Sequence, residues 1–224
     1  MTNESYFPCL SIGDPPILEE FLKTFCSMAE CEAAESEIRH VLITGARGVG
    51  KTTILQKACE ELEKEGFALH GFYREKVRHF GRGKGYDVVN LNKERAKLSR
   101  VDDEGGFLNR HDPNRSGRYL VQVEEFEEFV LPLLHASNTG ITVIDEIGKL
   151  EAYSRSFHQA VLSRLDDPRS KVFATIPARK GRPIPLVEQV RNRTDVKVFT
   201  VTKENRHSIL SNVLSVIKKI ASEN

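Results

Sequence analysis

The sequence predicts an α/β fold in which a mostly parallel sheet is covered by helices on both faces. Three observations predict it. Short β-branched segments alternate with longer amphipathic segments along residues 38–224, a pattern typical of parallel strands joined by crossover helices. The first strand, residues 38–44, runs into a glycine-rich loop that opens a helix over residues 53–64. A later apolar strand, residues 141–146, ends in two adjacent carboxylates.

The glycine-rich loop fits the pattern G-x-x-x-x-G-K-[ST], which predicts a phosphate-binding loop. Its glycines let successive backbone N–H groups point at the phosphates of a nucleoside triphosphate. Lys51 is expected to reach the β- and γ-phosphates, and the Thr52 hydroxyl is expected to bind Mg²⁺. The residues predicted to contact the nucleotide here are Gly45, Ala46, Arg47, Gly48, Val49, Gly50, Lys51, Thr52 and Thr53.

The strand over residues 141–146 ends in Asp145 and Glu146. Open α/β sheets bind ligands at the carboxyl ends of their strands, so Asp145 is expected to hold Mg²⁺ opposite Thr52. Glu146 is then well placed to orient and deprotonate a water molecule, which indicates hydrolysis. The alternative is that Glu146 only caps the chain or pairs with Lys149.

Three further side chains are candidates for the same site. Thr175 ends the strand over residues 171–176, where it is either a hydrogen-bond partner of the γ-phosphate or an ordinary strand residue. Arg206 opens the last predicted helix, residues 205–221, where it either supplies charge to the transition state or lies on the surface. Arg118 is a similar candidate.

The remaining elements follow from periodicity and turn residues. We expect strands over residues 67–73, 86–91, 96–101, 119–123 and 196–201, helices over 124–136, 153–166 and 186–193, and loops over 74–85, 102–117 and 178–182. Pro132 is expected to kink or shorten its helix. The basic segment over 74–85 either is the solvated loop of a hairpin between the flanking strands or contacts a nucleotide or polynucleotide, with Phe80 and Tyr86 as its stacking faces.

Residues 1–37 form a predicted acidic extension to a nucleotide-binding domain over 38–224. Residues 1–38 hold eight acidic side chains and one basic one. Apolar residues at helical spacing over 17–37 indicate a helix. This helix either covers an apolar patch of the domain or binds a partner.

Composition restricts the classes of function. The net charge of +1 does not favour a nucleic-acid partner. The four cysteines show no metal-binding spacing, so we expect reduced thiols and no zinc site. There is no apolar run long enough to span a membrane and no secretory signal pattern. We therefore expect a cytoplasmic protein.

With these motifs, the chain resembles the small P-loop nucleoside-triphosphatases found from hyperthermophilic prokaryotes to animals. The resemblance covers about residues 38–210, and its most specific part is the stretch D-E-I-G-K over 145–149. It implies a RecA-like sheet and Mg²⁺-dependent hydrolysis of ATP, GTP, CTP and UTP to diphosphate and phosphate, with loose base specificity and slow turnover.

The chain departs from this family's pattern at three places. Ala46 and Arg47 stand where the family has two prolines, which leaves open whether the added cation alters phosphate affinity. Leu150 replaces a methionine, and residues 1–37 have no counterpart. Two other functions stay open: a nucleotide or small-molecule kinase with an acceptor pocket, and a nucleotide-dependent switch or RNA-binding module.

Overall fold

The computed structural model describes residues 38–102, 112–135 and 140–222. The predicted extension over residues 1–37 and the middle of the predicted loop over 102–117 lie outside these residues. No helix in the described part of the chain is both long and apolar enough to cross a membrane.

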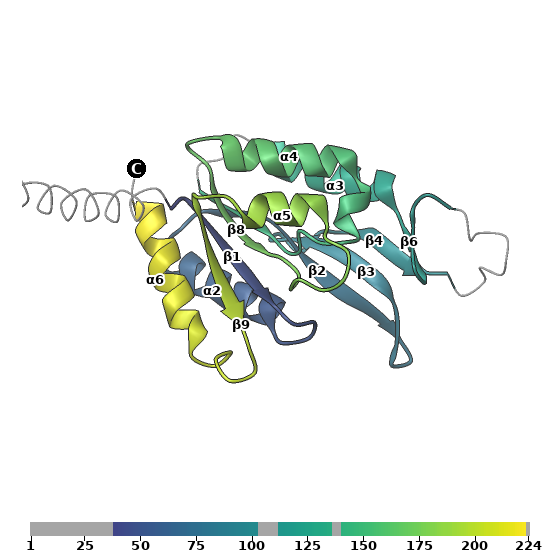
Figure 1. Ribbon diagram of the computed structural model, residues 1–224, viewed down its shortest axis with the longest axis horizontal. Coiled ribbons are helices and arrows are strands. Elements are labelled where there is room, and N and C mark those ends of the chain that lie inside the picture. Colours follow the sequence, from purple (N-terminus) through teal and green to yellow (C-terminus); the bar gives the residue numbers. More distant parts are fainter. Residues whose placement is uncertain (1–37, 103–111, 136–139, 223–224) are drawn as a thin grey trace, which may run out of the picture. The chain divides into compact units, whose positions relative to one another are not determined.

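Nine strands of the described chain form one mixed sheet in the order β5-β6-β4-β3-β2-β7-β8-β1-β9 (Figure 1). The parallel half contains β1 (His40–Gly45), β2 (Leu69–His79), β7 (Ile141–Ile144), β8 (Lys171–Thr175) and β9 (Val196–Val201). The antiparallel half adds β3 (Arg82–Asn90), β4 (Arg95–Val101), β5 (Arg115–Ser116) and β6 (Tyr119–Val121). The predicted mostly parallel architecture thus holds for the half that carries the phosphate-binding loop.

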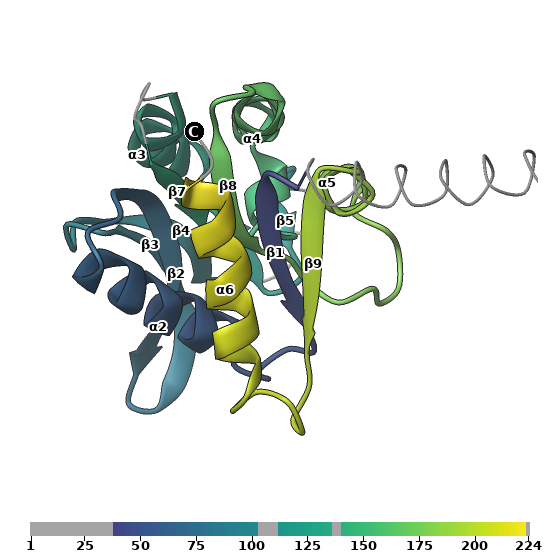
Figure 2. The same cartoon turned by 90° about the vertical axis from the view of Figure 1, so that its left-hand side faces the viewer.

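Helices cover both faces, as predicted (Figure 2). On one face, α2 (Lys51–Lys64) and α6 (Ile209–Ser222) pack through Leu55, Leu62 and Val213 against Ile43 and Phe173 of the sheet. The other face carries α3 (Val123–His135), α4 (Arg155–Asp166) and α5 (Pro185–Arg191). Two apolar layers therefore enclose the parallel strands, which is why those strands are continuous runs of buried residues.

The strand order brings the two sequence motifs to the same edge of the sheet. β8 lies between β1 and β7, with Ile43 paired to Thr175 and Ile144 paired to Ala174. The carboxyl end of β1, the end of β8 and the residues after β7 therefore meet. Crossover connections on both faces leave this edge open for a ligand.

Two predicted boundaries are wrong. The predicted hairpin at residues 74–85 is confirmed, but its connecting loop is shorter than predicted, because β2 continues to His79 and β3 begins at Arg82. The last helix begins at Ile209 instead of Asn205, so Arg206 lies in the turns before α6. Pro132 does not shorten its helix, since α3 continues past it to His135.

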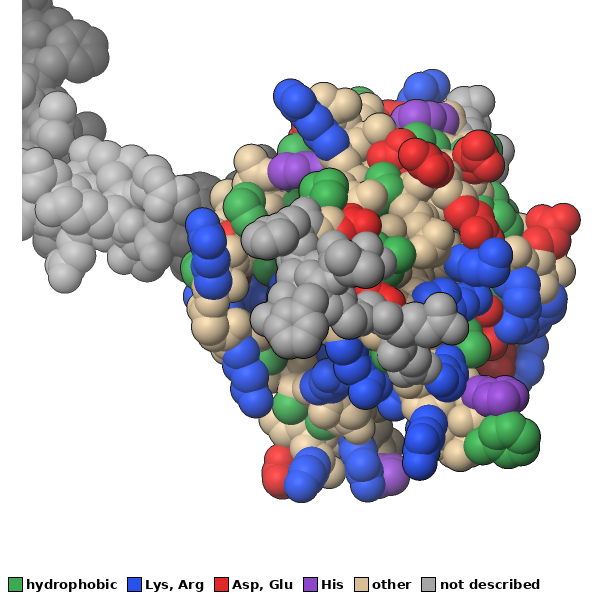
Figure 3. All heavy atoms as spheres, turned by 90° about the vertical axis from the view of Figure 1, so that its right-hand side faces the viewer, with side chains coloured by type: hydrophobic (Ala, Val, Ile, Leu, Met, Phe, Trp, Pro, Cys, Tyr) green, Lys and Arg blue, Asp and Glu red, His purple; other side chains and the backbone are tan. Residues whose placement is uncertain are grey.

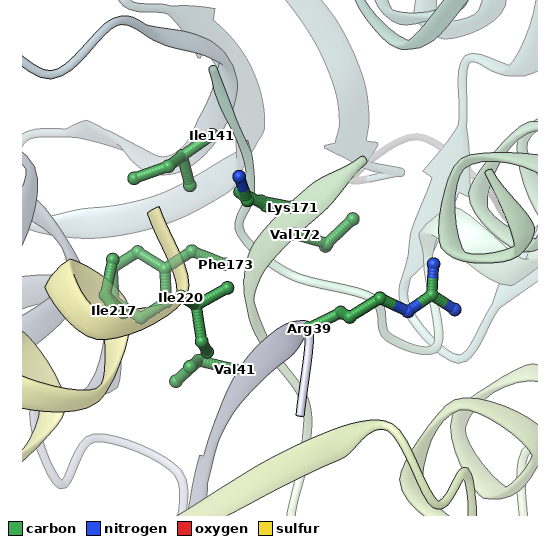
Figure 4. Close-up of a pocket in the computed structure, with 8 residues that line it drawn as sticks. All are labelled: Arg39, Val41, Ile141, Lys171, Val172, Phe173, Ile217 and Ile220. Carbon is green, nitrogen blue, oxygen red and sulfur yellow. The ribbon is translucent and has the colours of Figure 1, made fainter. Parts of the chain in front are cut away.

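A shallow apolar hollow lies at the opposite edge of the sheet (Figure 4). Its lining comes from the amino ends of β1, β7 and β8 and from α6, and includes Val41, Ile141, Phe173, Ile217 and Ile220. Because the motifs lie at the carboxyl ends of the same strands, this hollow is not part of the candidate site.

Candidate functional site

The phosphate-binding loop joins β1 to α2. A Cβ on Gly45 would lie 2.5 Å from the Val201 carbonyl oxygen, so only glycine lets β1 end this close to β9. Gly50 has a φ of 115°, a left-handed conformation that favours glycine, and the helix begins at the next residue. Val49 is buried and fixes the loop to the domain. The loop therefore opens at a helix N-terminus, where anions bind.

Lys51 is the first residue of α2, and its side chain is turned back into the loop. Its Nζ donates to the Gly45 carbonyl oxygen at 3.3 Å and lies 3.6 Å from Oε2 of Glu146. Only 9% of the residue is exposed. The ammonium is thus held between the two motifs, within the region where the phosphates are expected.

Asp145 follows β7 and is buried beneath the loop. Its Oδ2 accepts a hydrogen bond from Thr52 Oγ1 at 2.7 Å, which brings together the two predicted Mg²⁺ ligands. Its Oδ1 accepts from the Thr175 hydroxyl. Burial raises the pKa of this carboxyl, and the nearby charge of Arg74 opposes the rise.

Thr175 thus contacts Asp145. The hydroxyl predicted as a possible sensor of the γ-phosphate donates to the carboxylate, and the side chain is fully buried. In this structure, the Thr175 hydroxyl orients the Asp145 carboxylate.

Glu146 pairs with two cations. Its Oε2 lies 3.1 Å from Arg74 Nη2 and 3.6 Å from Lys51 Nζ, while only 12% of its side chain is exposed. The alternative pairing with Lys149 is not among the ion pairs of the described residues, and Lys149 is exposed. The carboxylate therefore faces the loop.

Sequence reasoning missed Arg74 and Glu151 as a buried pair. Arg74 Nη1 lies 3.1 Å from Glu151 Oε1, and Glu151 has no exposed surface. Burial raises the pKa of Glu151 to about 7, against the opposing charge of Arg74. Arg74 also lies over the ring of Tyr86, 4.8 Å from its centroid. The basic run over 74–85 gives no signal for this, because its other cations are on the hairpin surface.

Arg47, the cation that replaces a family proline, lies on the exposed part of the loop. Its Nη2 donates to the Tyr86 hydroxyl at 2.9 Å, and the interaction with Tyr86 is the main cause that raises the pKa of Arg47. Arg118 lies over the ring of Tyr119, 5.2 Å from its centroid, and the two tyrosine rings are 5.6 Å apart. Lysine and arginine side chains gather on this side of the molecule (Figure 3).

Two predicted residues are exposed. Thr53 faces solvent on the first turn of α2. Arg206 is also exposed, and its Nε contacts Nε2 of its neighbour His207 at 3.2 Å. Neither side chain contacts Asp145 or Glu146 among the hydrogen bonds and ion pairs of the described residues.

The donor set fits Mg²⁺. Mg²⁺ prefers oxygen ligands and is usually held by one or two carboxylates together with substrate phosphates and water. Asp145 and Thr52 supply one carboxylate and one hydroxyl at the edge of the phosphate-binding loop. The described residues contain no cluster of three or more histidine, cysteine or acidic side chains suited to a metal held by protein alone.

Comparison with known proteins agrees with this geometry. Residues 40–214 match the family model described as NTPase. The cancer-related nucleoside-triphosphatase of Homo sapiens is 46% identical over 186 residues, which is 80% of this chain and 97% of that protein. Nucleoside-triphosphatase THEP1 of Thermotoga maritima is 36% identical over 180 residues, 80% of this chain and 95% of that protein.

Two solved structures share the fold. The solution structure of a human cancer-related nucleoside triphosphatase aligns with a TM-score of 0.72 and 44% identity, covering 83% of this chain and all of that one. The crystal structure of THEP1 from Aquifex aeolicus aligns with a TM-score of 0.66 and 32% identity, covering 80% of this chain and 99% of that one. The predicted family and P-loop fold are confirmed, and the chain belongs to this NTPase family.

Proposed function

We propose that the chain hydrolyses nucleoside 5′-triphosphates to the diphosphate and phosphate in a Mg²⁺-dependent reaction. Its similarity to proteins named nucleoside-triphosphatases supports this activity. The observation that carries the hydrolytic mechanism is the position of Glu146, whose Oε2 lies 3.6 Å from Lys51 Nζ. A carboxylate is thus beside the cation that binds the terminal phosphates.

Binding begins at the loop. The backbone N–H groups of residues 46–51 and the N-terminus of α2 present partial positive charge to the phosphates. Lys51 exchanges its contacts with Gly45 and Glu146 for the β- and γ-phosphates. The contact with Glu146 is a long ion pair, 3.6 Å, between side chains that are only 10% and 12% exposed, so the negative charge of the phosphates has to replace that of Glu146.

Asp145 and Thr52 would hold Mg²⁺, which would supply positive charge to the phosphate oxygens. Thr175 and the backbone N–H of Arg74 both donate to Asp145, the latter at 3.5 Å. These bonds orient the carboxylate, and the bond from Thr175 favours its ionised form, which opposes the rise in its pKa caused by burial.

Glu146 accepts a proton from the water that attacks the γ-phosphate. Both ion pairs of Glu146 are made by Oε2, so Oε1 is the oxygen proposed to accept a hydrogen bond from water. As the pair with Lys51 opens, the other cation, Arg74, remains 3.1 Å away and holds the carboxylate in place. General-base catalysis of this kind contributes about 10²–10⁴-fold in rate.

We also propose broad base specificity and slow turnover. Each side chain assigned here contacts phosphate, metal or water, and none reads the base. ATP, GTP, CTP and UTP are therefore expected to be hydrolysed within about tenfold of one another, since differential binding of the base contributes little to the transition state.

The test is phosphate release from the four triphosphates, with and without Mg²⁺, by the parent and by Glu146→Gln. Glutamine keeps the size of the side chain but cannot take a proton. We expect hydrolysis to fall about 10²–10⁴-fold while the affinity for ATP changes less than about tenfold. Asp145→Asn serves as the contrast, because it is expected to weaken Mg²⁺-dependent binding itself.

Three outcomes would contradict the proposal. A parent protein that binds ATP and Mg²⁺ but releases no phosphate would point to a switch. Phosphate transfer only on addition of a nucleotide or small-molecule acceptor would point to a kinase. Parent-like hydrolysis by Glu146→Gln would show that another group activates the water.

A further inference from the structure

We propose that Arg74 is a positioning residue that orients Glu146 for water activation, and that Glu151 anchors Arg74 from the buried side. The inference rests on the proposed function, because it assigns Arg74 a role in hydrolysis through Glu146. Neither residue is part of the two sequence motifs.

Arg74 is placed between the two carboxylates by its strand. β2 pairs with β7, and Phe72 lies opposite Ile144, so Arg74 is beside the residues that follow β7. Its guanidinium lies 3.1 Å from Glu146 through Nη2 and 3.1 Å from Glu151 through Nη1. The planar guanidinium holds both carboxylates at fixed directions, which a lysine ammonium cannot do.

The surroundings of Arg74 limit its movement. The ring of Tyr86 lies against the guanidinium, with its centroid 4.8 Å away. The backbone N–H of Arg74 is 3.5 Å from Asp145 Oδ2, so main chain and side chain both contact the site. Only 19% of the side chain is exposed.

Glu151 has the geometry of an anchor. It is the first residue of a short 3₁₀ helix, Glu151–Tyr153, and its side chain has no exposed surface. Its Oε2 has no hydrogen-bond partner in the described structure, and a Cβ on Gly148 would lie 3.0 Å from that oxygen. Arg74 is the cation that compensates this buried carboxylate, so the two are expected to stay together.

Arg74 is needed because Lys51 is proposed to leave Glu146 when it binds the phosphates. Among the described residues, the ion pairs of Glu146 are with Lys51 and Arg74. Once Lys51 contacts phosphate, Arg74 is the remaining partner that fixes the Glu146 carboxylate. A displacement of about 1 Å in a reacting group can cost about 10²-fold in rate, so loss of this partner should lower kcat.

The test compares Arg74→Gln with Arg78→Gln in two backgrounds, the parent and Glu146→Gln. Arg78 lies on the same strand, is exposed and makes no ion pair among those of the described residues, so it is the matched control. In the parent, Arg74→Gln is expected to lower kcat about 10–100-fold with KM changed less than about threefold. In Glu146→Gln, the same change is expected to have almost no further effect, because residues that act as a unit are non-additive.

Two further variants separate positioning from folding. Arg74→Lys keeps the charge and is expected to recover part of kcat. Because Arg74→Gln leaves Glu151 uncompensated, it is also combined with Glu151→Gln, which removes the buried charge and is expected to restore folding without restoring kcat. Glu151→Gln alone is expected to lower kcat severalfold.

The inference is overturned if Arg74→Gln, alone or with Glu151→Gln, raises kcat, acts on KM alone, or lowers kcat equally in both backgrounds. These results differ from failure of the proposed function. That failure appears as absent phosphate release by the parent or as parent-like hydrolysis by Glu146→Gln, neither of which depends on Arg74.

Discussion

The fold is expected to lose stability in mild acid through His40, the first residue of β1. Its imidazole is fully buried. Nδ1 accepts a hydrogen bond from the Val172 backbone N–H at 3.1 Å, and Nε2 lies 3.1 Å from the Leu165 carbonyl oxygen. A neutral ring protonated on Nε2 satisfies both contacts. A second proton on Nδ1 would remove the acceptor of Val172.

The sign and size of the effect follow from the pKa. Burial is the main cause that lowers the pKa of His40 from 6.5 to about 4, although Asp195 opposes it. The unfolded chain therefore binds a proton at a higher pH than the folded chain. The resulting stability is fully present above about pH 6.5 and is lost as pH falls toward 4. Between about pH 7.5 and pH 5 the loss is about 2 kcal/mol.

The assay is urea denaturation at these two pH values for the parent, His40→Gln and His207→Gln. Other groups titrate in this range: burial also lowers the pKa of His70 to about 4, and burial raises that of Glu151 to about 7. Protonation of Glu151 stabilises the fold as the pH falls, so its effect is opposite to that of His40. His70 and Glu151 titrate in both the parent and His40→Gln, so the difference between the two proteins reports His40.

His40→Gln is expected to be less stable at neutral pH but to lose about 2 kcal/mol less on acidification than the parent. His207 is exposed, so His207→Gln should follow the parent. The reasoning is refuted if His40→Gln loses as much stability between the two pH values as the parent does.

Two further predictions follow from the loop and the hairpin. Lys51→Ala is expected to abolish useful triphosphate binding, because the loop amides cannot replace its charge; unchanged ATP affinity by calorimetry would contradict the loop assignment. Phe80 and Gly81 connect β2 to β3 with φ values of 46° and 75°. Asparagine adopts this left-handed conformation more readily than phenylalanine, so Phe80→Asn is expected to stabilise the fold by about 1 kcal/mol in thermal denaturation. The Phe80 ring is 92% exposed, so little burial is lost, and an unchanged or lowered melting temperature would contradict this.

The local part of the site could be predicted from the sequence. The glycine spacing of the loop and the carboxylates after an apolar strand are patterns within short segments, and parallel strands bring such segments to one edge of the sheet. This is why Lys51, Thr52 and Asp145 lie together as expected. The sequence also predicts that Thr175 lies at this edge. Its contact with Asp145 could not be predicted, because it depends on β8 lying between β1 and β7.

The long-range part could not be predicted. Arg74 lies in a run of charged residues that is typical of an exposed loop, yet its partner Glu151 is 77 residues away. A buried arginine is stable only where a carboxylate meets it. That condition is set by the packing of β2 against β7 and by the 3₁₀ helix after β7, and no short segment of the sequence contains it.

The charges at the site indicate how this buried pair would act in the proposed reaction. Asp145, Glu146 and Glu151 place three carboxylates in a space where Lys51 and Arg74 are the paired cations. If Lys51 moves to the phosphates as proposed, one cation remains near three carboxylates, and this imbalance favours a divalent cation at Asp145. In the proposed reaction, Arg74 would then hold the other two carboxylates apart from the metal, with Glu151 buried and Glu146 directed at water. The same residue would thus separate the metal-binding acid from the water-activating acid, although the two are adjacent in the sequence.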